Sequence, residues 1–209
     1  MRGKILVSFT AVWLLLGGAA AQAAPAGEVI DPAAHTASAR AFRELGGQAG
    51  PRLAGMPAAH QMNRAALGEG LAVKMVGLDA LQRYQPGADV EALLEDLQTV
   101  VYSIRVAGAV HGEMTVGKVN GAWSPRGFGG MAHARALEKA RARAGGAALL
   151  VRVPALGIEF VGRRDANGLS LTPLTDHAAA GLRAGQPLPA ARAFELLLPL
   201  ARQHNGLPS

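Results

Sequence analysis

The sequence has no cysteine, and this absence excludes disulfides, thiolate zinc sites and a lipid-modified cysteine behind a leader. Aromatic residues make up only 4 % of the chain, so leucine, valine and alanine have to fill the interior. We expect no nucleic-acid partner, because few aromatic rings are present to stack on bases. With 209 residues, 50 % of them hydrophobic, the chain is long enough for one full core or two small ones.

Motifs of catalysis and metal binding are also missing. No two of the six histidines have the i, i+4 spacing of a helical metal site, and there is no HExxH run. There is no GxSxG elbow, and serine, histidine and aspartate occur in any chain of this size, so their presence does not predict a catalytic triad. We therefore predict neither a metal nor a cofactor.

Residues 1–23 have the pattern of a signal peptide. Arg2 and Lys4 precede an apolar run, and Ala21-Gln22-Ala23 offers the small-x-small cleavage site before Ala24. This pattern predicts export by the general secretion route to the periplasm or the exterior. The alternative is an uncleaved membrane anchor, for which the apolar run is near the short limit. No later stretch is long and apolar enough to span a bilayer, so we expect no transmembrane helix after leader removal.

The remaining chain divides by composition into a segment rich in alanine, glycine and proline at 24–60 and a single α+β domain at 61–209. We expect the first segment to be loosely ordered. Periodicity and breaker residues predict helices at 33–45, 78–84, 90–97, 131–144 and 189–203.

A three-stranded unit at 100–130 is the clearest structural signal. Apolar residues alternate with polar ones from Tyr102 to Val106, the two-residue period of a half-buried strand. Asn120-Gly121 lies between two strand-like runs and predicts a type I′ hairpin, which needs positive φ at both positions. Pro125 has no N–H to donate, which indicates an edge strand.

That hairpin predicts a register in which Val119 faces Ala122 and Lys118 faces Trp123. Trp123 then shares the core face with Met114 and Val116.

A second hairpin is predicted at Asn167-Gly168 and makes the chain look repeated. Segments 89–130 and 131–174 each read as helix-strand-strand-strand, although chance similarity explains the match equally well. The predicted fold is α+β, an antiparallel sheet of about six strands with helices packed on one face.

Charge is distributed unevenly. Residues 131–164 have a balance of +5, whereas residues 25–100 have a balance of −3. A basic surface attracts anionic partners. The residues proposed for such an electrostatic adaptor are Arg135, Lys139, Arg141, Arg143, Arg163 and Arg164.

Three hypotheses of function follow. The first is a non-catalytic binding or interaction module of the cell envelope, whose partner is an envelope protein or small ligand. Its candidate binding residues are Trp123, Arg126, Phe128, Arg135 and Lys139. The second is a periplasmic hydrolase that uses His111, Glu113 and His133. The third is the electrostatic adaptor, in peripheral contact with an anionic envelope surface.

Overall fold

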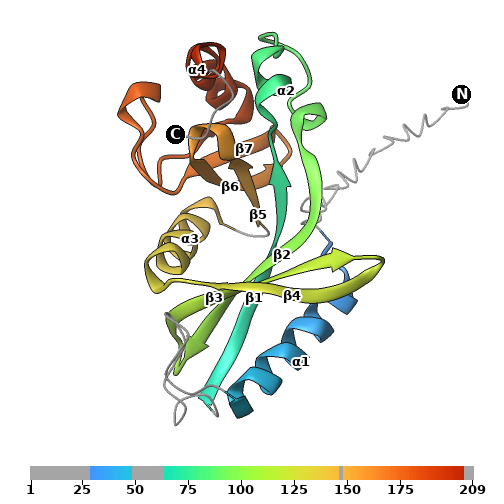
Figure 1. Ribbon diagram of the computed structural model, residues 1–209. Helices are drawn as coiled ribbons and strands as arrows, with labels where there is room; N and C mark the ends of the chain where they lie inside the picture. Colours follow the sequence, from blue (N-terminus) through green and yellow to red (C-terminus); the bar gives the residue numbers. More distant parts are fainter. Residues whose placement is uncertain (1–28, 49–63, 146–147, 205–209) are drawn as a thin grey trace, which may run out of the picture.

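The computed structural model describes residues 29–48, 64–145 and 148–204 (Figure 1). The predicted signal peptide, and residues 24–28 and 49–60 of the predicted N-terminal segment, lie outside these ranges. The strands are β1 (Ala65–Met75), β2 (Glu95–Val106), β3 (Ala109–Val119), β4 (Ala122–Gly129), β5 (Ala148–Val153), β6 (Ile158–Asp165), β7 (Gly168–Pro173) and β8 (Leu188–Pro189). The helices are α1 (Pro32–Gln48), α2 (Leu78–Gln82), α3 (Met131–Ala144) and α4 (Ala190–Gln203), with single 3-10 turns at Glu91–Leu93, Pro154–Leu156 and Ala178–Ala180.

The predicted α+β class is confirmed, but the sheet differs from the prediction. The described strands form one eight-stranded sheet in the order β4-β3-β2-β1-β5-β6-β7-β8. Neighbours are antiparallel except β1 and β5, which run parallel. The expectation of about six antiparallel strands is therefore wrong, because it omitted β1 and β8 and because α3 returns the chain to the middle of the sheet beside β1.

The first hairpin matches the prediction residue by residue. Asn120 and Gly121 form the turn with φ of 48° and 82°, as a type I′ turn requires. Val119 pairs with Ala122, and Lys118 pairs with Trp123. β4, which contains a proline, lies at the outer edge of the sheet.

The second hairpin lies where it was expected, but its two turn residues are Ala166 and Asn167, one position early. Asp165 pairs with Gly168 across this turn, and the Asp165 carboxylate accepts a 2.8 Å hydrogen bond from the Asn167 N–H. This aspartate-initiated turn explains the shift, since it begins the chain reversal at Asp165 and leaves Gly168, with φ of 101°, as the first residue of β7.

The helix predicted at 90–97 is wrong. Only the turn Glu91–Leu93 is helical there, and β2 begins at Glu95. The apolar residues of the predicted stripe are divided between two clusters, with Val90, Leu93 and Leu94 in one and Leu97 in the other. Pairing of this segment with the end of β1 overrides its helical periodicity.

Helices cover both faces of the sheet, which corrects the expectation of one covered face. α3 packs on one face through Leu137, Ala140 and Ala144, against Val73 and Leu150. On the opposite face, α1 covers the β1–β4 half in a cluster that includes Phe42, Tyr102 and Met114. α4 covers the β5–β8 half on that same face, where Phe160, Phe194 and Leu197 are fully buried. No helix among the described residues is long and apolar enough to cross a membrane.

Candidate functional site

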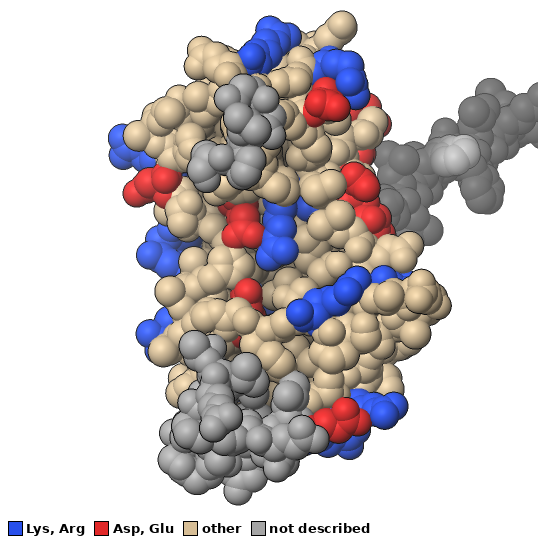
Figure 2. Space-filling view, viewed as in Figure 1, with Lys and Arg blue, Asp and Glu red and all other residues tan. Residues whose placement is uncertain are grey.

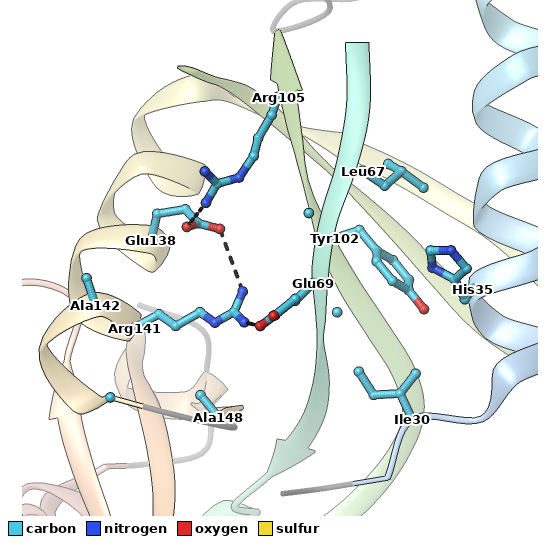
Figure 3. Close-up of a pocket in the computed structure, with 13 residues that line it drawn as sticks. Ile30, His35, Leu67, Glu69, Tyr102, Arg105, Glu138, Arg141, Ala142 and Ala148 are labelled. Carbon is cyan, nitrogen blue, oxygen red and sulfur yellow. Dashed lines mark hydrogen bonds and ion pairs between the residues drawn. The ribbon is translucent and has the colours of Figure 1, made fainter. Parts of the chain in front are cut away.

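A cleft lies in the middle of the sheet, beside the part of β1 that is paired with β2 but not with β5. β1 pairs with β2 from Ala65 to Met75, but it pairs with β5 only from Ala72 to Met75. No other described strand pairs with residues 65–71. Beside this edge lies a cleft of about 1220 Å³ (Figure 3). Its lining includes Ile30, His35, Leu67, Gly68, Glu69, Gly70, Tyr102, Arg105, Glu138, Arg141, Ala142, Gly145 and Ala148.

Two arginines and two glutamates lie between β1 and α3 in this cleft (Figure 3). Arg105 of β2 pairs with Glu138 of α3, and Arg141 of α3 pairs with Glu69 of β1. A longer contact of 4.0 Å joins Arg141 Nη1 to Glu138 Oε1. The Arg141 side chain is only 15 % exposed, and burial lowers its pKa. Its partner Glu69 is 80 % exposed, so a sheltered guanidinium is neutralised by a carboxylate held in solvent.

The other side of β1 is apolar. Ile30, His35 and Tyr102 lie there (Figure 3), and the rings of His35 and Tyr102 are 5.8 Å apart. β1 has a bulge between Leu67 and Gly70, and a β-carbon at Gly70 would lie 2.8 Å from the Tyr102 ring. Glycine is required at this point because the strand crosses directly over the aromatic ring.

A second polar group crosses the α3 face of the sheet and centres on His133. His133 Nδ1 is 2.8 Å from Glu113 Oε2 of β3, and Nε2 is 2.6 Å from Glu159 Oε2 of β6. Glu159 also accepts a 2.7 Å hydrogen bond from Arg152 Nε of β5. We call Glu113, His133, Glu159 and Arg152 the carboxylate–imidazole bridge.

This bridge joins strands that are far apart in the ladder. β2, β1 and β5 lie between β3 and β6, so a flat sheet would separate the two strands by about 19 Å. The side chains of Glu113, His133 and Glu159 together span this separation across the start of α3. The carboxylates of Glu113 and Glu159 are thereby connected through a single imidazole.

Both carboxylates raise the pKa of His133 to about 9, Glu113 contributing more than Glu159. His133 in turn lowers the pKa of Glu159, with a further contribution from Arg152. His133 is consequently an imidazolium at neutral pH and donates from both nitrogens. In this state it can neither accept a proton as a general base nor ligate a metal.

The hydrolase hypothesis named three residues, of which the structure brings two together. Glu113 and His133 are hydrogen-bonded, whereas the His111 side chain forms no hydrogen bond or ion pair with any described residue. The described residues contain no group of three or more histidine, cysteine, aspartate or glutamate side chains that could hold a metal ion.

The five candidate binding residues lie in three places. Trp123 and Phe128 pack against the α1 cluster, and the Trp123 Nε1–H donates a 2.8 Å hydrogen bond to Asp31. Arg126 lies over Gly117 on the opposite face of the sheet. Arg135 and Lys139 lie on the exposed side of α3. The structure therefore does not gather these five residues into one site.

Arg135 and Lys139 do share a smaller groove of about 280 Å³ with Arg143. Among the described residues, none of these three cations forms an ion pair with a carboxylate, and Arg143 donates to the Ala184 carbonyl at 3.3 Å. We call Arg135, Lys139 and Arg143 the basic groove. Figure 2 shows Lys and Arg side chains along the left edge of the molecule, the side on which Figure 1 shows α3.

Sequence reasoning singled out none of the other members of the two charged groups except Arg141, which it named only as one of the six adaptor cations. Arg105, Arg152 and Glu159 each stand between two buried apolar residues of a strand. A charged residue in such a position needs a partner, because burial without one is costly. A charged residue between two apolar strand residues is therefore a pattern that could have predicted Arg105, Arg152 and Glu159. No such pattern surrounds Glu69, Glu138 or Arg141 in the sequence.

Comparison with known proteins assigns the chain to no family: no family model, no curated protein and no solved structure matches it.

Proposed function

We propose that the chain is an exported binding module of the cell envelope, which holds its ligand in the cleft beside β1 and catalyses no reaction. The observation that supports binding is the cleft itself, an opening of about 1220 Å³ at an incomplete part of the sheet with a sheltered arginine in its wall. The leader-like pattern of residues 1–23 supports export.

Chemical-shift mapping on the isotopically labelled protein tests the binding proposal. Test ligands are amino acids, short peptides, sugars and sugar phosphates, each at millimolar concentration. We expect at least one class to shift the amides of Gly68, Glu69 and Gly70 and to leave those of α4 unchanged. If every class leaves the cleft amides unshifted, the binding proposal is wrong.

Export is tested by expressing the full chain in a Gram-negative host. We expect a periplasmic product that begins at Ala24, and we expect Ala23→Phe to accumulate the uncleaved precursor because the bulky side chain blocks the small-x-small site. A product that retains residues 1–23 in the cytosol would contradict the proposal.

The electrostatic adaptor is a second candidate, supported by the basic groove. Of its six predicted residues, Arg141 is paired with Glu69, Arg163 donates to the Ala144 carbonyl and Arg164 is paired with Glu91. Arg135 and Lys139 of the basic groove form no ion pair among the described residues, and Arg143 donates only to the Ala184 carbonyl.

The adaptor candidate predicts binding to vesicles rich in anionic phospholipid that weakens steeply with added salt. Lys139→Glu should abolish this binding. Arg192→Glu, the same charge change on exposed α4, should weaken it far less. Equal losses for the two variants would show that net charge, and not the groove, is responsible.

The hydrolase hypothesis receives less support from the geometry, because His133 is protonated at neutral pH and both of its ring nitrogens are engaged. Turnover of an ester or amide substrate that disappears in His133→Gln would nevertheless re-establish it.

A further inference from the structure

We propose that the ligand of the cleft is an extended peptide, which pairs with the open edge of β1 and places a carboxylate on Arg141. This inference rests on the proposed binding function and adds to it the class of ligand and the groups that recognise it. Two independent features support it, the unpaired backbone of β1 and the pairing of Arg141 with Glu69.

The backbone feature is the stretch 65–71. Its β2 side is paired, while its other side has no strand partner among the described residues. Backbone N–H and C=O groups along such an edge form a template for one more strand. Natural edges are usually protected by several charges or a proline, yet this stretch has no proline and Glu69 as its only charge.

The position of this edge limits what can occupy it. The edge lies in the interior of the eight-stranded order, recessed between β2 and the end of α3 at Gly145. A folded domain that offered its own sheet edge would collide with α3 and β5. A single extended chain fits, and seven residues of β1 allow it a length of about 23 Å.

The second feature, the pairing of Arg141 with Glu69, favours a ligand that has a carboxylate. Arg141 is 15 % exposed, and the partner it now has, Glu69, is 80 % exposed. An exposed glutamate loses little when a ligand carboxylate replaces it, whereas the sheltered guanidinium needs an anion at all times. Glu69 is therefore the internal competitor of an acidic ligand. Arg105, whose side chain is 37 % exposed, pairs with Glu138 and adds a second guanidinium to the same cleft (Figure 3).

The test ligand is the peptide acetyl-Thr-Val-Thr-Val-Glu with a free C-terminal carboxylate. Its matched neutral form ends in glutamine amide. We expect the acidic peptide to slow amide hydrogen exchange within residues 65–71 and to bind about tenfold more tightly than the neutral form, since a charge-assisted hydrogen bond is lost in the latter.

Variants of the two pairing residues separate recognition from folding. Arg141→Gln should reduce affinity about tenfold, and Glu69→Gln should increase it several-fold by removing the competitor. Arg192→Gln, which removes an exposed arginine of α4 far from the cleft lining, is the control and should change nothing. Because Glu69 is exposed, its variant remains informative even if Arg141→Gln does not fold.

The inference is wrong if the peptide protects β4, the outer edge, in place of residues 65–71, or if Glu69→Gln leaves the affinity unchanged. It is also wrong if neither peptide binds while another ligand class shifts the cleft amides, and in that case the binding proposal survives. If no ligand class shifts those amides, the binding proposal itself fails.

Discussion

Replacing His133 with glutamine removes the centre of the carboxylate–imidazole bridge and should make the protein less stable in a way that depends on pH. The imidazolium of His133 donates to Glu113 and to Glu159, which belong to strands separated by three others. Glutamine is polar and of similar size, but it has no charge. The buried Glu113, whose side chain is 8 % exposed, would then lack its cationic partner.

The magnitude follows from the pKa of His133, which the fold raises from 6.5 to about 9. Such a shift corresponds to roughly 3 kcal/mol of stabilisation, and we reduce it to about 2 kcal/mol because the side chain is 31 % exposed and solvent screens the pair. A raised pKa means that this stabilisation is complete below pH 6.5 and is lost as pH rises through about 9.

At low pH, protonation of the Glu159 carboxylate limits the stabilisation that the bridge provides. The folded state lowers the pKa of Glu159 from 4.5, so its contribution is present above that pH and is lost as pH falls through the lowered pKa. The bridge is therefore at full strength between about pH 4.5 and pH 6.5.

Urea unfolding followed by circular dichroism, in a pH series from about 4.5 to above 9, measures the effect. The free energy of unfolding of the His133→Gln variant should be about 2 kcal/mol below that of the unmodified protein at pH 6, and the two should converge as pH rises above 9. His111→Gln is the control, since the His111 side chain has no hydrogen-bond or ion-pair partner among the described residues. A difference between His133→Gln and the unmodified protein that stays constant with pH would refute the reasoning.

Three further changes test the fold. Gly121→Ala should lower the free energy of unfolding by about 1–2 kcal/mol, because φ of 82° strains a residue with a β-carbon, and urea unfolding would show it. Trp123→Phe removes the Nε1–H donor that contributes most to the lowered pKa of Asp31, so NMR titration should find that pKa closer to its ordinary value. Phe194→Ala, at a fully buried position, should cost about 3–5 kcal/mol in thermal or urea unfolding; a loss below 1 kcal/mol would mean that α4 is not packed as described.

Much of the local structure was predictable. The Asn120-Gly121 turn, its register and the bounds of α3 follow from interactions within a few residues, such as positive φ at a turn and glycine at a helix end. The helix predicted at 90–97 was wrong because the structure of this segment depends on a contact distant in the sequence. Its spacing fits a helix, but it lies beside the end of β1, and strand pairing satisfies more of its backbone than one short helix would.

The candidate sites were less predictable. Glu113 and His133, which are 20 residues apart in sequence, were predicted as candidate residues because they are polar groups around the central strands. Glu159 and Arg152 were not predicted. The relation of these four residues depends on the order of the strands in the sheet, which no local pattern encodes.

The sequence by itself determined where most strands and helices form, where the chain turns and which strand lies at the outer edge, since these depend on neighbouring residues. Only the tertiary structure decided that β5 joins β1 in parallel at residues 72–75 alone, which leaves the cleft open and places Glu159 beside His133. The physical reason is that a strand selects a distant partner by the surface that both bury together. That surface exists only when the whole sheet is assembled.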